Sequence, residues 1–264
     1  MKLYSILLLS TLLLLFSCDE KQVDAETIET TETRASNIPA ELKLVLDAHG
    51  GLDQWNKMNS LSYEFNRGEK TEIQKIDLKT RKVRIEGDGY VIGNDGENIW
   101  VSPNLEAYSG KSARFYHNLL FYFYAMPFVV SDPGINYKVL DQAEVKGKTY
   151  NRISITYGEN IGDTPEDEYI IYSDPETNKM EWLFYTVTFF SGEKSTKYNA
   201  LNYNGWKEVN GLLVPETMSG YLSEDGVVTT KRYDNLFKDI KFSEETFDQA
   251  TFEMPAEAEV EVVE

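Results

Sequence analysis

The chain has 264 residues, with 44 acidic and 26 basic side chains and a formal net charge of −18 at pH 7. Affinity for nucleic acid or for an anionic lipid surface depends on clustered lysine and arginine, so this charge argues against both partners. The single cysteine excludes an intrachain disulfide and a zinc site built from several thiolates.

The first segment has the layout of a secretory signal. Lys2 precedes an apolar run from Leu3 to Phe16 that is shorter than the roughly 20 residues needed to span a bilayer. Ser17 followed by Cys18 resembles the bacterial lipobox, in which the peptide is removed and the cysteine is acylated. We therefore expect residues 1–17 to be a lipoprotein signal peptide, cut between Ser17 and Cys18. The alternative is an incidental thiol behind an ordinary signal peptide.

The residues after Cys18 are acidic and poor in large apolar side chains, so they bury too little surface to offset their ordering entropy. This composition predicts a flexible acidic tether over residues 18–37. At the other end, residues 256–264 alternate acid with Ala and Val, which predicts an acidic tail or, alternatively, a last edge strand. Between them, residues 38–255 are long enough for one domain with a full core.

This domain begins with two helix patterns. Leu42, Val45, Leu46 and His49 share one helical face, and Gly50-Gly51 ends the first helix. A second helix is expected over residues 52–58. His49 stands at the carboxyl end of the first helix, where the helix dipole favours an imidazolium, so we interpret it as a capping residue rather than a catalytic one.

Strand patterns follow along most of the chain. Apolar residues alternate with polar ones, and Gly, Asn and Asp mark tight turns about every ten residues, which predicts an antiparallel meander. Strands do not alternate with helices along the chain, which argues against a Rossmann or TIM architecture. The fold class is therefore mainly β with a few helices (α+β). Strands are expected within residues 61–65, 73–78, 83–85, 90–92, 99–101, 137–145, 150–157, 168–172, 180–190, 197–203, 206–214, 217–222 and 227–233.

Residues 113–130 break the strand pattern because they form an aromatic segment that is apolar on almost every side. Pro127 ends the helix that this segment predicts. A helix with so little polar surface is either covered by the core or lines a hydrophobic space. The sequence leaves both a lid and a plug in the mouth of a curved sheet open.

The residues offer little for catalysis. Neither histidine, His49 or His117, belongs to a recognisable catalytic motif, and there is no phosphate loop and no nucleophile elbow. The densest carboxylate cluster lies in the loop 162–168, but its spacing differs from that of an EF-hand. The candidate metal ligands in this loop are Asp163, Glu166, Asp167 and Glu168. We interpret the loop as a solvated surface rather than as a metal site. We expect no cofactor, no metal and no enzymatic activity.

Several stretches together resemble the LolA/LolB-like superfamily of lipoprotein-localisation factors, and most closely flavobacterial-type envelope lipoproteins of unknown function. The resemblance covers residues 39–255 and is carried by Ala48-His49-Gly50-Gly51, Met126-Pro127-Phe128, the loop 162–168 and residues 206–212. It implies a curved, incomplete β-barrel with an N-terminal helix and a helical lid or plug. The concave face and the helix of such carriers enclose acyl chains.

The resemblance implies a lipid-anchored envelope protein, held on the bilayer through acylated Cys18, that binds an acyl chain, a lipoprotein or another hydrophobic ligand. An Asp directly after the lipidated cysteine, here Asp19, marks inner-membrane retention in enteric bacteria, whereas acidic residues at this place accompany export to the cell surface in Bacteroidota-type organisms. Of the two we favour the outer membrane, facing the periplasm or the cell surface. The alternatives are a structural or protein-interaction module with a filled core, and a hydrolase that uses the acidic loop. Alternation and the aromatic segment suggest these lining residues for the ligand: Leu61, Tyr63, Phe65, Trp100, Phe115, Leu119, Leu120, Phe123, Tyr124, Met126 and Trp182.

Overall fold

The computed structural model describes residues 37–158, 162–224 and 226–262. The predicted signal peptide, its cleavage site at Ser17 and Cys18, and all of the predicted tether except Asn37 lie outside the described residues. No helix within the described ranges is both long enough and apolar enough to cross a membrane.

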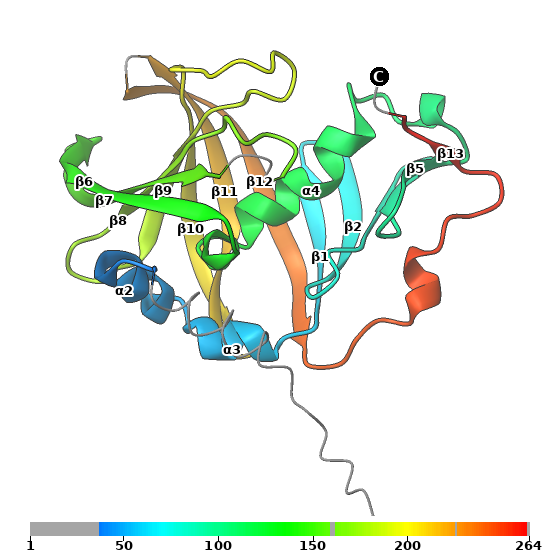
Figure 1. The fold of residues 1–264 in the computed structure, drawn as a ribbon, viewed down its shortest axis with the longest axis horizontal. Helices are drawn as coiled ribbons and strands as arrows, with labels where there is room; N and C mark the ends of the chain where they lie inside the picture. The colour runs from blue at the N-terminus through cyan, green and yellow to red at the C-terminus, as the bar shows by residue number, and fades with distance from the viewer. Residues whose placement is uncertain (1–36, 159–161, 225, 263–264) are drawn as a thin grey trace, which may run out of the picture. The chain divides into compact units, whose positions relative to one another are not determined.

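One antiparallel sheet of thirteen strands dominates the structure (Figure 1), as the turn spacing predicts. Its spatial order is β13-β5-β4-β3-β2-β1-β12-β11-β10-β9-β8-β7-β6. The strands are β1 (Ser60–Arg67), β2 (Lys70–Asp77), β3 (Val83–Gly87), β4 (Tyr90–Asn94), β5 (Ile99–Ser102), β6 (Ile135–Val145), β7 (Lys148–Tyr157), β8 (Tyr169–Ser173), β9 (Met180–Tyr185), β10 (Asn199–Val209), β11 (Leu212–Glu224), β12 (Val227–Ser243) and β13 (Glu259–Val260).

Along the chain, β1 lies in the middle of the sheet, β5 lies near one edge and β6 forms the opposite edge. Strands β1 to β5 run outwards as hairpins, the chain crosses to β6 at the opposite edge, and β6 to β12 return to the middle. There β12 pairs with β1, from Ser60 opposite Ser243 to Asn66 opposite Leu236. The pairing of the first and twelfth strands therefore holds the two halves of the sheet together.

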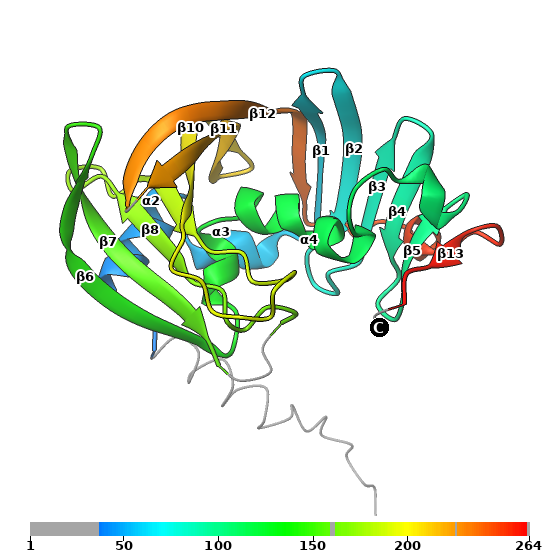
Figure 2. The ribbon, with the colours of Figure 1, turned by 90° about the horizontal axis from the view of Figure 1, so that it is seen from above.

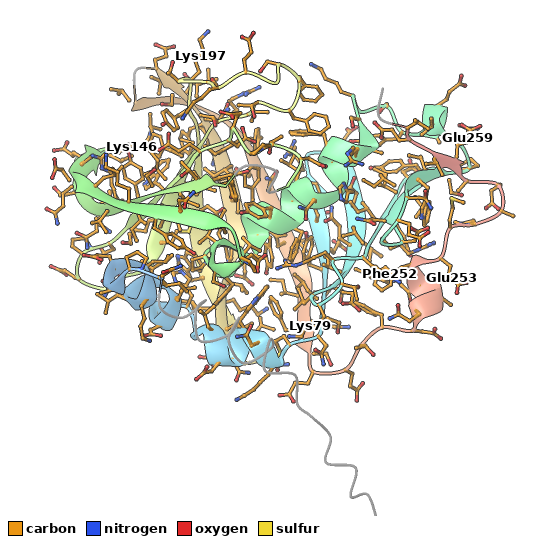
Figure 3. The ribbon with its side chains drawn as sticks, viewed as in Figure 1. Lys79, Lys146, Lys197, Phe252, Glu253 and Glu259 are labelled. Atoms are coloured by element: carbon orange, nitrogen blue, oxygen red, sulfur yellow. The ribbon has the colours of Figure 1, made fainter. Side chains whose placement is uncertain are left out.

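The sheet is open, because its two edge strands lie at opposite ends of it. Lys146, in the turn between β6 and β7, and Glu259, on β13, mark these ends (Figure 3). Seen from above, the sheet curves around α4 (Ala113–Tyr124), which lies on its concave side (Figure 2). The prediction of a mainly β fold with a curved antiparallel sheet and few helices is confirmed.

The remaining helices are short. They are α2 (Ala40–Ala48) and α3 (Leu52–Lys57) near the start, with the 3-10 turns η1 (Leu105–Ala107), η2 (Phe128–Ser131) and η3 (Gln249–Phe252). The apolar face of α2 predicted from the sequence is the buried one, since Leu42, Val45 and Leu46 are 0–1% exposed. Helix α4 begins where the Ser112 hydroxyl accepts a hydrogen bond from the Phe115 amide at 3.0 Å.

Large rings fill the space between the sheet and α4. The Tyr124 ring lies 4.8 Å from Tyr63 and 4.5 Å from Phe237, measured between centroids, and Tyr63 and Phe237 are 5.2 Å apart. The Tyr203 hydroxyl donates to the Phe123 carbonyl at 2.7 Å, which ties the end of α4 to β10. The middle of the concave face is therefore a packed core, and α4 is a plug there.

Two local expectations differ from the structure, and near the C-terminus the alternative of a last edge strand is the observed one. On β2 the side chain of Ile73 is 44% exposed, whereas Glu72 and Gln74 are buried. The predicted strand 180–190 ends at Tyr185, and the chain leaves the sheet there as a long loop. Within the predicted acidic tail, Glu259–Val260 forms β13 and pairs with Val101 and Trp100 of β5.

Candidate functional site

Two of the stretches that carry the sequence resemblance pack against each other. His49-Gly50-Gly51 follows α2, and Asn210-Gly211 forms the turn between β10 and β11. Gly50 has a φ of 110°, and a Cβ added to it would lie 2.2 Å from the Gly211 carbonyl oxygen. The Leu213 amide also donates to the His49 carbonyl at 2.9 Å. We call this contact the glycine joint; only glycine fits at position 50.

His49 is part of the glycine joint and is fully buried. Its Nδ1 lies 2.8 Å from the Val45 carbonyl oxygen, its ring packs edge-on against Trp206 at 4.8 Å, and its Nε2 has no hydrogen-bond partner. Burial lowers the pKa of His49 to about 4. The position at the helix end is the expected one, but the expected imidazolium is wrong because desolvation outweighs the helix dipole.

A third stretch, Met126-Pro127-Phe128, is also structural. All three residues are buried. Phe128 stacks on Trp55 of α3, with ring centroids 4.8 Å apart and planes 5° apart. Stacked aromatic rings of this kind fix the orientation of the elements that carry them. The motif therefore docks the N-terminal helices beneath the end of α4.

The fourth stretch, the loop 162–168, lies beside a cavity of about 370 Å³ on the flank of α4. Rings from α4 (Phe115, Tyr122 and Phe123), from β7 and β8, and from the loop after β9 line this cavity together with Leu119 and Ile135. The rings that come from outside α4 are those of Tyr157, Tyr169 and Phe189. A volume in this range, with mostly apolar walls and a few polar groups, is typical of sites for small ligands.

Ring contacts hold the cavity walls in place. Tyr169 lies 5.5 Å from Tyr122 and 6.0 Å from Tyr157 between centroids, and the hydroxyls of Tyr122 and Tyr157 share a hydrogen bond. At the other end, Phe115 lies 5.1 Å from Phe189. These contacts join α4 to β7, β8 and the loop after β9, so the cavity lies between elements that are distant in sequence.

Polar groups gather at the rim of the cavity. The Arg114 guanidinium pairs with the Asp163 carboxylate at 2.7 Å, and Asp132 pairs with Arg81 at 2.7 Å. His117 is 9% exposed; its Nδ1 contacts the Arg114 carbonyl, and burial lowers its pKa. It is therefore neutral at pH 7, and it lines the cavity whereas His49 does not.

The carboxylates of the loop 162–168 have structural partners. Asp167 is buried and accepts hydrogen bonds from the Thr188 amide at 2.8 Å and the Thr186 hydroxyl at 3.4 Å, while burial raises its pKa. Glu168 accepts from Ser154 at 2.6 Å and from Tyr198 at 2.7 Å, whereas Glu166 is exposed. Among the described residues, no three His, Cys, Asp or Glu side chains are grouped closely enough to hold a metal ion.

The structure divides the predicted lining residues into two sets. Phe115, Leu119 and Phe123 line the cavity. The other eight are packed side chains: Trp100 is buried over Gly93, Trp182 belongs to a small core on β6–β10, and the rest lie in the main core. Those in the main core are Leu61, Tyr63, Phe65, Leu120, Tyr124 and Met126.

Sequence reasoning missed most of the cavity wall. Tyr122 belongs to the aromatic segment, but its neighbours Tyr157 and Tyr169 come from predicted strands whose pairing the sequence does not specify. Arg114 and Asp132 gave no signal at all, because a single charged residue near a helix end is ordinarily solvated. The useful signals are the aromatic segment, which contains Phe115, Leu119 and Phe123, and the loop 162–168, although the loop indicates a metal rather than a cavity.

A buried carboxylate fixes the opposite flank of α4. Glu72 is fully buried; it pairs with Lys70 at 2.7 Å and accepts hydrogen bonds from Tyr116 at 2.8 Å, from Gln74 at 2.9 Å and from Tyr90. Tyr116 belongs to α4, so this network ties the helix to β2. It also explains why β2 turns polar residues inwards, since a buried carboxylate with several donors is satisfied there.

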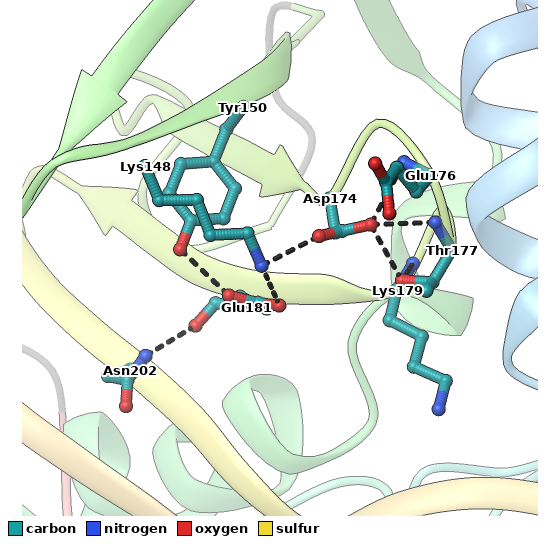
Figure 4. A network of polar contacts seen from close by, with 8 residues as sticks. All are labelled: Lys148, Tyr150, Asp174, Glu176, Thr177, Lys179, Glu181 and Asn202. Carbon is teal, nitrogen blue, oxygen red and sulfur yellow. Dashed lines mark hydrogen bonds and ion pairs between the residues drawn. The ribbon is translucent and has the colours of Figure 1, made fainter.

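A further network reinforces β7, β8 and β9 and contributes nothing to the cavity wall (Figure 4). Lys148 lies 2.6 Å from both Asp174 and Glu181, and Asp174 also accepts from the Thr177 amide at 2.6 Å. The ion pair with Lys148 lowers the pKa of Asp174 and raises that of Lys148. This network holds the turn between β8 and β9, which is a structural role.

Comparisons with known proteins agree with this fold. A family of unknown function, DUF6503, matches residues 99–213, a range that contains every residue lining the cavity but not His49 or Gly50. None of the curated proteins compared matches the chain.

Among solved structures, a DUF1329 family protein from Desulfovibrio piger is similar with a TM-score of 0.50 and 13% identity, over 82% of this chain and 97% of that one. A LolA superfamily protein from Nitrosomonas europaea matches with a TM-score of 0.47 and 8% identity, over 76% and 96%. An outer membrane lipoprotein-sorting protein domain from Vibrio parahaemolyticus matches with a TM-score of 0.44 and 10% identity, over 86% and 97%. The similarity to the DUF1329 family protein is one of fold, and the LolA/LolB-like and flavobacterial relationships stay predictions.

Proposed function

We propose that this protein is an envelope lipoprotein, anchored through acylated Cys18, which binds an acyl chain or another hydrophobic ligand in the cavity beside α4. The single observation that supports binding is the cavity of about 370 Å³ with its aromatic and aliphatic walls. The proposed site differs from the one that the sequence suggested, because the middle of the concave face is filled by α4 and the cavity lies on its flank.

Binding, rather than catalysis, is the activity that the cavity chemistry supports. His49 is fully buried and lies outside the cavity lining, and Nδ1 of His117 is held against the Arg114 carbonyl. In the acidic loop, Asp163 is held in an ion pair and Asp167 and Glu168 in hydrogen bonds. No observation favours the hydrolase alternative.

Native mass spectrometry tests the binding proposal. Residues 37–262 contain all thirteen strands and both cores, so a chain that begins at residue 19 keeps the complete folded unit. We expect this chain to retain an apolar ligand, and we expect Leu119→Trp, which fills the cavity, to lose it. The matched control is Leu44→Trp on α2, because Leu44 is 52% exposed and is not part of the cavity lining.

The proposal fails if the unaltered chain and Leu44→Trp carry no ligand and bind no added alkyl probe. It also fails if Leu119→Trp binds as well as the unaltered chain does.

The anchor has its own test. Replacing Cys18 by alanine in the full chain is expected to abolish metabolic labelling by a fatty acid and to move the protein out of the membrane fraction. Sucrose-gradient separation of the two membranes then tests the outer-membrane location. Labelling of the Cys18→Ala variant would contradict the proposed anchor.

A structural or protein-interaction module remains the second candidate, and the packed middle of the concave face favours it. In that case the cavity would stay empty in every preparation, and a protein partner would be needed to explain the function. The mass-spectrometric experiment separates the two candidates, since only the first requires a ligand that Leu119→Trp displaces.

A further inference from the structure

The charges around the cavity are unbalanced. Of the described residues that line it, three are carboxylates (Asp132, Asp163 and Asp167) and one is a guanidinium (Arg114). His117 adds no positive charge at pH 7, because burial lowers its pKa. Carboxylates therefore outnumber guanidinium groups in the lining, and an excess of negative charge repels an anionic group and attracts a cationic one.

Two of the three carboxylates are matched by cations. Arg114 pairs with Asp163 and Arg81 pairs with Asp132, each at 2.7 Å. Asp167 is different: it is 5% exposed, it accepts hydrogen bonds from the Thr188 amide and the Thr186 hydroxyl, and it forms no ion pair with any described residue. Burial raises its pKa, so an approaching positive charge would stabilise the carboxylate form.

The walls add a second attraction for cations. Six aromatic rings line the cavity, three from α4 and three from other elements. The face of an aromatic ring attracts a cation electrostatically, and this attraction strengthens where water is excluded. Aromatic walls combined with an unmatched carboxylate are the physical requirements for recognising an organic cation.

We propose that the cavity selects amphiphiles whose head group is a cation, namely an alkyl chain that ends in an ammonium group. This inference rests on the proposed binding function and specifies its ligand class. The alkyl chain contacts Leu119, Ile135 and the rings, and the ammonium group faces the carboxylates of the lining, of which Asp167 is the unmatched one. An anionic head group, such as that of a free fatty acid, meets the same carboxylates and is disfavoured.

Three probes of equal chain length test the selection. Hexyltrimethylammonium, 1-hexanol and hexanoate are titrated by calorimetry into the chain that begins at residue 19. We expect the ammonium probe to bind at least about tenfold more tightly than hexanoate, with the alcohol between them. Because the groups at the rim are partly exposed, raising the salt concentration is expected to shrink this difference.

The pair at the rim allows a matched charge test. Arg114 and Asp163 have side chains that are 34% and 42% exposed, so Arg114→Gln and Asp163→Asn are not expected to disturb the core. We expect Arg114→Gln to tighten binding of the ammonium probe about threefold and Asp163→Asn to weaken it about threefold. The controls are Lys207→Gln and Glu216→Gln, which make the same charge changes in an exposed pair outside the cavity lining.

Each outcome decides the inference. Tighter binding of the ammonium probe, with opposite shifts in the two rim variants and none in the controls, supports it. Equal or tighter binding of hexanoate overturns the charge selection and leaves the proposed function standing. Failure of all three probes to bind overturns both.

Discussion

The glycine joint and the cavity both contain stretches that carry the sequence resemblance, yet they are built in opposite ways. At the glycine joint, Gly50 touches the Gly211 carbonyl so closely that no Cβ fits, and His49 is fully buried. At the cavity, Gly162 has no atom within 4 Å of an added Cβ, and about 370 Å³ of space stays open. A stretch that carries the resemblance therefore forms either a close contact between backbones or the wall of an open cavity, and packing distinguishes the two.

The largest expected effect compares the two glycines directly. Gly50→Ala places a Cβ on a residue with positive φ and against the Gly211 carbonyl oxygen. It is therefore expected to lower the free energy of unfolding by roughly 3 kcal/mol or more. Gly162→Ala meets no neighbour, and its φ of 71° makes a loss of only about 1 kcal/mol the expected result. Urea denaturation measures both. Equal losses would erase the distinction between the joint and the cavity.

Acidification is the next test. The folded pKa of His49, about 4, lies below its ordinary value of 6.5, so between these two values the unfolded chain binds a proton that the folded chain does not. Stability is therefore expected to fall as the pH drops from 6.5 towards 4, by on the order of 3 kcal/mol from this residue, and to be unaffected by it above 6.5.

The variant His49→Asn keeps a donor for the Val45 carbonyl and removes the titration. It is expected to flatten the acid-side loss of stability over this window. His117 at the cavity has a pKa shifted in the same direction. If His117→Asn flattened the curve and His49→Asn did not, the acid-side loss of stability would come from the cavity and not from the glycine joint.

The smallest effect on stability is expected at the cavity wall. Leu119→Ala removes a half-buried side chain beside open space, which costs less than about 1 kcal/mol, whereas Leu46→Ala on α2 removes a fully buried one and costs about 2–5 kcal/mol. Thermal and urea unfolding of the two variants give the comparison. A cost at Leu119 as large as that at Leu46 would mean that the cavity is closed in solution.

The sequence predicted the order of elements because the signals for them are local. The apolar face of α2, the alternation of Leu61, Tyr63 and Phe65, and the Asn-Gly turn at residues 210–211 each depend on a few neighbouring residues. The length of β12 was underestimated, since polar and apolar residues alternate less clearly after Tyr233. Its pairing with β1 maintains the strand as far as Ser243.

The cavity was not predictable in the same way, because it depends on which strands come together. From the sequence, Glu72 is expected at the surface, and only the hydrogen bonds from Tyr90 and Tyr116 explain its burial. The strand predicted over residues 186–190 is wrong because Asp167 holds Thr186 and Thr188 outside the sheet. Both effects join residues that are far apart along the chain. The sequence contains the partners but gives no indication that they meet.

The pairing of β1 with β12 also has a kinetic consequence. Residues 60–67 of β1 can pair with β12 only when residues 236–243 are available. Most of the chain therefore has to be present before the two halves of the sheet can join. Contacts of such long sequence separation slow folding, and an unpaired edge that waits for its partner is prone to join another chain. We expect this protein to fold late and slowly. Until β12 pairs with it, β1 is the strand whose free edge is most exposed to pairing with another chain.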